Sequence, residues 1–115
     1  MSELHDLVAQ ILQFRDERDW KQFHNPKDIS ISLCLEAAEV LEHFQWKSPT
    51  EVEAYCQEHR AEIGSELADV LCFVLILSHE LKVDLTEAFN LKMEENKRKY
   101  PVDKAKGNHV KYSKL

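Results

Sequence analysis

Residues that form tight turns are scarce in this chain, which has 2 glycines and 3 prolines among 115 residues. All-β and α/β folds need many tight turns, and glycine and proline form such turns most readily. At 115 residues, of which 43% are hydrophobic, the chain is long enough for one domain of ordinary size and too short for two comfortable ones. We therefore predict an all-α fold in a single domain over residues 1–115.

Apolar residues recur at helical spacing in several segments that are separated by short polar breaks. The predicted helices cover residues 3–20, 27–45, 60–81 and 85–99, with a shorter helix from residue 49 toward residue 59. The shorter helix carries a capping-box signature, because Ser48 precedes Pro49 and Glu51 stands three residues after the cap. The tail, residues 101–115, has too little apolar content for a core of its own and is predicted to be less regular. Together these elements predict a bundle of four to five helices.

The segment VLCFVLIL, residues 70–77, is apolar on nearly all sides, which predicts a helix buried centrally or at a subunit interface. It is far shorter than the roughly 20 residues that a spanning helix needs, so we expect no membrane association. The net charge of −6 disfavours nucleic-acid binding. Three cysteines without CxxC spacing predict no disulfide framework, and the start of the chain lacks a leader, so we expect a cytoplasmic protein.

Two pairs of acidic residues stand inside apolar segments. Glu36 and Glu39 occur in SLCLEAAEVLEHFQW, and Glu66 and Asp69 occur in ELAD, directly before the most apolar segment. Residues three apart lie one turn apart on the same side of a helix, so each pair presents two carboxylates to one place. The 26 residues between Glu39 and Glu66 suffice for a turn, the short helix and an antiparallel return. We therefore expect the two pairs to face each other.

Four gathered carboxylates repel one another, and an unpaired carboxylate in a dry site takes up a proton. A hard divalent cation resolves the conflict, because all-oxygen ligation suits Mg²⁺ or Mn²⁺, and Mg²⁺ also binds substrate phosphates. For either pair alone, a solvated helix face is the simpler interpretation, but both pairs lie within apolar segments. A ferritin-like diiron site is disfavoured, because no histidine follows Glu36, Glu39 or Glu66 by three residues. We predict a metal site made of these three residues and Asp69.

Further motifs accompany the acidic pairs along the chain, namely RDERDWKQFHNP, FQW, NKRKYP and KYSKL. With them, the sequence resembles the MazG-like all-α nucleoside triphosphate pyrophosphohydrolases over nearly its whole length, and most of all the members that act on dCTP. The resemblance implies an enzyme that hydrolyses a nucleoside triphosphate to monophosphate and pyrophosphate with Mg²⁺ as cofactor, dCTP or a related pyrimidine nucleotide being the first choice. It also implies a homo-oligomer, a dimer of dimers, that removes noncanonical or surplus nucleotides.

The resemblance also implies roles for single residues. Glu36 or Glu39 would accept the proton of the attacking water, and the sequence does not decide between them. The residues expected to contact the substrate are Trp20, Phe23, His24, Trp46, Asp69, Phe73, Lys97 and Tyr100. A structural role is as good an interpretation for His24, which would cover a helix end, and for Lys97, whose charge would complement a helix dipole.

Two positions depart from the pattern of the family members that act on dCTP. Ile11 replaces a histidine nine residues before Trp20, and Phe73 replaces a tyrosine four residues after Asp69. Loss of these polar groups should alter hydrogen bonding to the sugar or the base. Two alternative functions stay open: the same fold acting on dUTP or phosphoribosyl-ATP, and a non-catalytic helical protein whose acidic edge binds a basic surface.

Overall fold

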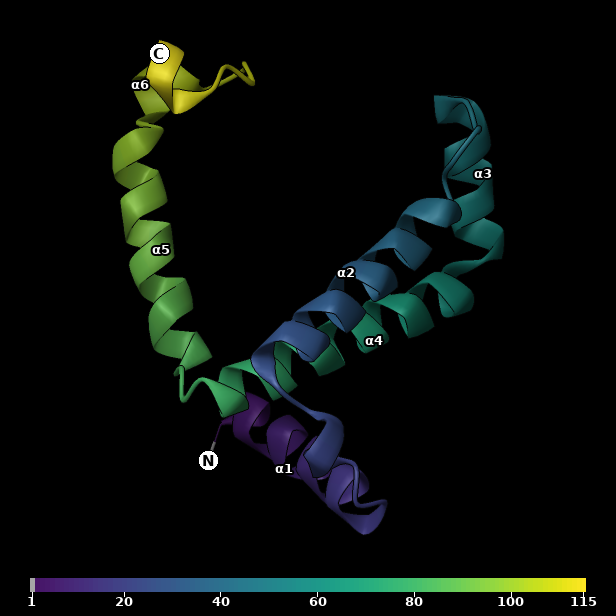
Figure 1. Ribbon diagram of the computed structural model, residues 1–115. Helices are drawn as coiled ribbons and strands as arrows, with labels where there is room; N and C mark the ends of the chain where they lie inside the picture. The colour runs from purple at the N-terminus through teal and green to yellow at the C-terminus, as the bar shows by residue number, and fades with distance from the viewer. Residues whose placement is uncertain (1) are drawn as a thin grey trace. The chain divides into compact units, whose positions relative to one another are not determined.

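The computed structural model describes residues 2–115, which form helices and contain no β-strand (Figure 1). Contacts within the chain divide it into two compact units, Met1–Lys82 and Val83–Leu115. The first unit contains α1 (Glu3–Glu17), the 3₁₀ helix η1 (Lys21–Phe23), α2 (Pro26–Glu42), α3 (Pro49–Glu58) and α4 (Arg60–Glu80). The second contains α5 (Leu85–Lys99), α6 (Val102–Ala105) and the 3₁₀ helix η2 (Tyr112–Lys114). The predicted all-α class is confirmed.

Side-chain caps start the helices where the sequence indicated. Ser48 and Glu51 form the predicted capping box of α3, with Pro49 in the first turn. Asp84 starts α5 by accepting a hydrogen bond of 3.0 Å from the Glu87 backbone N–H. These caps satisfy N–H groups that have no partner inside the helix, so the sites where helices begin follow from local sequence.

Two predicted helix ends were too late in the chain. The first helix ends at Glu17 instead of residue 20, because Asp19 takes a left-handed backbone conformation with φ of 55°. The second ends at Glu42 instead of residue 45, and the turn that follows it includes Trp46 with φ of 68°. A left-handed residue cannot continue a right-handed helix, and apolar spacing alone does not reveal where one occurs.

Helices α2 and α4 lie side by side and run in opposite directions, while α1 packs against α4 (Figure 1). Ile29 of α2 and Leu75 and Ile76 of α4 are the buried apolar residues of the described chain, at 2%, 1% and 4% exposure. The burial predicted for the second half of α4 is therefore confirmed at Leu75 and Ile76, whereas Leu71 is 41% exposed. No helix among the described residues combines the length and apolar content needed to span a bilayer.

One buried ion pair ties α1 to α4. Arg15 is 3% exposed, and its Nη1 donates a hydrogen bond of 2.8 Å to Glu80 at the end of α4. Its Nε donates a second bond of 3.1 Å to Asp16. The guanidinium can be buried there because two carboxylates neutralise it.

The second unit is held together by local contacts. Lys99 pairs with Glu95 at 2.8 Å along α5, and its ammonium lies 4.6 Å from the ring centre of Tyr112. The rings of Tyr100 and Tyr112 meet edge to face, 6.0 Å apart. These contacts join the end of α5 to the tail, whose helical parts, α6 and η2, span only four and three residues.

Candidate functional site

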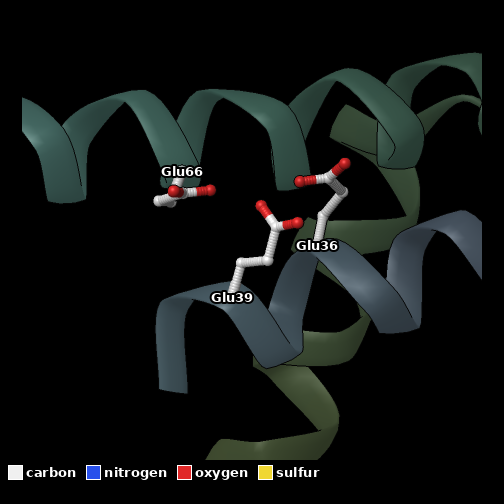
Figure 2. A group of neighbouring side chains, drawn as sticks. All are labelled: Glu36, Glu39 and Glu66. Atoms are coloured by element: carbon white, nitrogen blue, oxygen red, sulfur yellow. The ribbon is translucent and has the colours of Figure 1, made fainter. Parts of the chain in front are cut away.

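Three of the predicted metal ligands come together between α2 and α4. Figure 2 shows the carboxylates of Glu36 and Glu39 rising from α2 toward α4, which carries Glu66. One carboxylate oxygen from each of the three residues lies within 4.8 Å of the others. The antiparallel return through α3 produces this arrangement, because it brings the first half of α4 beside the second half of α2 (Figure 1). We call these three residues the carboxylate group.

Asp69, the fourth predicted ligand, is exposed and stands outside the carboxylate group. It lies one turn after Glu66 on α4, and its negative charge contributes to raising the pKa of both Glu36 and Glu66. Asp69 is therefore an electrostatic neighbour of the group, with an exposed side chain.

The carboxylate group carries more negative charge than its surroundings neutralise. Removal from water is the main cause that raises the pKa of Glu36, followed by repulsion from Glu39. Hydrogen bonding with Glu39 is the main cause that raises the pKa of Glu66, followed by burial. The Oε2 atom of Glu36 is buried and has no hydrogen-bond partner. A hard divalent cation would satisfy that oxygen and relieve the repulsion, so the donor set fits Mg²⁺ or Mn²⁺.

A mostly apolar pocket of about 100 Å³ lies between the α1–η1 segment and α4. It is lined by Ile11, Phe14, Arg15, Trp20, His24, Cys72, Phe73 and Ile76. The pocket thus gathers three of the residues predicted to contact the substrate, and both positions that depart from the family pattern. We call it the aromatic pocket.

The aromatic pocket lies within electrostatic range of the carboxylate group. The pKa of the Cys72 thiol in its wall is raised by burial, and further by the charges of Asp69 and Glu36. The pocket also contains one unsatisfied polar atom, since Nδ1 of His24 is buried and has no hydrogen-bond partner. A ligand that binds both places would have an end that a divalent cation can bridge to the carboxylates, and a flat or apolar end near Trp20.

The other predicted substrate contacts lie outside the lining of this pocket. Phe23 and Trp46 are 63% and 92% exposed, so both rings present open surface. Lys97 and Tyr100 belong to the second unit, where Lys97 pairs with Glu94 at 3.1 Å and Tyr100 packs against Tyr112. For these four residues a role in binding stays a prediction.

Comparison with known proteins identifies the family. The model of the MazG-like family matches residues 31–115. Over 114 residues the chain is 40% identical to dCTP pyrophosphatase 1 of Mus musculus and 37% identical to that of Homo sapiens, covering 97% of this chain and 67% of each relative. This chain belongs to the MazG-like family. The crystal structure of a pyrophosphatase from Archaeoglobus fulgidus matches this MazG-like protein with a TM-score of 0.83 and 37% identity, over 88% of this chain and 94% of that one.

Sequence reasoning missed a histidine and a tyrosine beside the carboxylate group of this MazG-like protein. His43 and Tyr55 line an open space of about 420 Å³ together with Glu39, Glu42 and Glu66. His43 follows Glu39 by four residues, so the two lie on the same side of α2. That spacing is a signal in the sequence, whereas nothing in the sequence indicated that Tyr55 of α3 lies there.

Proposed function

We propose that this MazG-like protein hydrolyses dCTP, or a related pyrimidine deoxynucleotide, to the monophosphate and pyrophosphate with Mg²⁺ as cofactor. Its family membership and its named relatives make the chain a nucleotide pyrophosphohydrolase. The observation that carries the narrower proposal is the carboxylate group, with its unpartnered Glu36 oxygen, within electrostatic range of the aromatic pocket. A nucleoside triphosphate has the two ends that such a site requires.

The carboxylate residues would hold the metal, with Glu36, Glu39 and Glu66 as the central ligands and Asp69 completing the set. A bound divalent ion would neutralise triphosphate charge and lower the pKa of a water molecule that it carries. Either Glu36 or Glu39 would accept the proton from the attacking water. Mn²⁺ is the alternative ion, because it takes the same oxygen ligands.

The aromatic pocket would receive the nucleoside. Trp20 and Phe73 supply aromatic surface for the base and sugar, and the free Nδ1 of His24 supplies a polar contact. Ile11 and Phe73 bring no hydrogen-bonding side-chain group to this pocket, so we propose that shape and stacking contribute more to selection than in family members with histidine and tyrosine there. The exposed rings of Phe23 and Trp46 extend the stacking surface.

We propose that Lys97 and Tyr100 contact the phosphates of the substrate. Lys97 is already paired with Glu94, so the triphosphate would compete with an exposed ion pair that contributes little energy. On this proposal the whole chain, residues 1–115, acts as one functional domain. Its role in the cytoplasm is the removal of surplus or noncanonical nucleotides.

We also propose that the chain forms a homo-oligomer, a dimer of dimers. Large apolar side chains are widely exposed, including Leu41 at 66%, Phe89 at 66% and Leu91 at 65%. Apolar surface on that scale is expected to be covered by another protein surface, and a second copy of the chain is the simplest partner. Light scattering at micromolar concentration tests this, and a monomeric mass would contradict it.

The decisive experiment measures pyrophosphate release from dCTP with Mg²⁺, and identifies the second product by chromatography. We expect dCMP from the wild type, and loss of activity in Glu39→Gln and Asp69→Asn with an unchanged helical circular dichroism signal. Glu53→Gln, which alters an exposed carboxylate on α3, is the matched control and should retain activity. If the protein is inert toward every triphosphate and binds no Mg²⁺, the proposal fails and the alternative of a non-catalytic helical protein is supported.

A substrate panel tests the nucleotide preference separately. It includes dUTP and phosphoribosyl-ATP beside the common nucleoside triphosphates, and it compares kcat/KM values. We expect pyrimidine deoxynucleotides to be preferred. Comparable values for all common nucleotides would refute the preference while leaving the pyrophosphohydrolase assignment intact.

A further inference from the structure

A histidine connects the carboxylate group to α3. His43 directly follows the last residue of α2, and its side chain is 14% exposed. Its Nδ1 lies 2.6 Å from the hydroxyl oxygen of Tyr55, and its Nε2 lies 3.8 Å from Oε1 of Glu66. The imidazole therefore lies between a tyrosine on α3 and a proposed metal ligand on α4.

Tyr55 is itself held in place on α3. Its ring stacks on the ring of His59, with centroids 4.0 Å apart and planes inclined by 13°. The ammonium of Lys47 lies 4.3 Å from the centre of the Tyr55 ring, within cation–π range. Because these neighbours restrict the ring, its hydroxyl has a defined position relative to His43.

We propose that Tyr55 and His43 form a positioning pair that holds the Glu66 carboxylate in the orientation in which it binds the metal, an inference that rests on the proposed function. In this pair the Tyr55 hydroxyl would donate to Nδ1, which places the ring hydrogen on Nε2, the nitrogen nearer to Glu66. At 3.8 Å this contact is longer than a hydrogen bond and acts electrostatically. His43 acts through Glu66, and Tyr55 acts through His43.

The physical reason for such a pair is the flexibility of glutamate. A free glutamate side chain loses rotamer freedom when it is fixed on a metal, which costs binding free energy. A neighbour that restricts the carboxylate beforehand reduces that cost, and residues behind metal ligands commonly change affinity by about 10–100-fold when they are removed. The long contact between His43 and Glu66 places the expected effect at the lower end of that range.

The test is a titration of the substrate-free protein with Mn²⁺, followed by electron paramagnetic resonance. We expect Tyr55→Phe and His43→Leu each to raise the Kd for Mn²⁺ about tenfold. Tyr55→Phe removes only the hydroxyl and keeps the ring that contacts His59 and Lys47. His79→Leu, which alters an exposed histidine at the end of α4, is the matched control and should bind Mn²⁺ like the wild type.

The double variant distinguishes a positioning pair from two separate structural effects. If Tyr55 acts through His43, Tyr55→Phe causes no further loss once His43→Leu is present, whereas independent effects on folding would add. Wild-type affinity in the single variants, additive losses in the double variant, or an equal loss in His79→Leu would each overturn the inference. A wild type that binds no Mn²⁺ would overturn the proposed metal site together with it.

Discussion

Two clusters of charge in the first unit differ in how well they are satisfied. At Arg15 the buried guanidinium has carboxylate partners at 2.8 and 3.1 Å. In the carboxylate group, by contrast, neighbouring acidic side chains raise the pKa of Glu36 and of Glu66, and a buried oxygen of Glu36 has no partner. A satisfied charge contributes to the fold, whereas an unsatisfied one points to a ligand that the chain alone does not supply. Removing each charge should therefore have opposite consequences.

The largest effect is expected for Glu36→Gln, which should lower kcat for pyrophosphate release at least about 10³-fold, or about 4 kcal/mol. The metal-free protein should be as stable as the wild type or more so, because the substitution removes repulsion within the carboxylate group. Pyrophosphate assays and thermal unfolding in EDTA measure the two outcomes. A clear loss of metal-free stability would mean that the Glu36 carboxylate is satisfied in the fold after all.

The next effect is expected for Arg15→Met, which should lower the free energy of unfolding by about 3 kcal/mol, because it leaves the half-buried Glu80 without its partner. Urea denaturation measures this change. Arg15→Met combined with Glu80→Leu should recover much of the loss, since no unpaired charge remains. Arg60→Met, at an exposed position, is the control; an equally large loss there would remove the contrast between satisfied and unsatisfied charge.

A smaller effect is expected in the aromatic pocket, where Phe73→Tyr adds a hydroxyl to an apolar wall. A new hydrogen bond to a bound nucleotide is worth about 1 kcal/mol, so the ratio of kcat/KM values between two nucleotides should change about fivefold. The substrate panel measures the ratio, and the Kd for Mn²⁺ should not change. A variant that altered metal affinity instead would show that the pocket and the carboxylate group are not separate in function.

The smallest effect is on the pH dependence of stability without metal. The pKa of Glu36 and of Glu66 is raised above the ordinary value of 4.5, so the folded protein holds these protons more tightly than the unfolded chain. Stability should therefore decrease as the pH rises from about 4.5 through the raised pKa values. Melting temperatures measured in EDTA should decrease over this pH range, and Mg²⁺ should abolish the decrease. A melting temperature that rises over this range in EDTA would contradict the unsatisfied state of the group.

Local features of the sequence were sufficient to predict where helices begin and which acidic residues share one side of a helix. Ser48 and Asp84 begin helices because a cap is a contact between residues close in the chain. Glu36 and Glu39 share a helix side for the same reason, and the length of chain before Glu66 allowed an antiparallel return. Two helix ends were predicted too late, because Asp19 and Trp46 take left-handed conformations shortly after the helices stop. Left-handed residues other than glycine have no clear signal in the sequence, which limits this reasoning.

The sequence by itself thus determined an all-α chain, the placement of Glu36 and Glu39 on one side of a helix, and the resemblance to the MazG-like family, which the family match confirms. Only the tertiary structure decided which residues from distant segments meet. It placed Ile11 and Phe73 in one pocket, buried Arg15 against Glu80, and brought Tyr55 of α3 to His43. The physical reason is that helix periodicity states which face a residue occupies, whereas packing of one helix against another decides what that face meets.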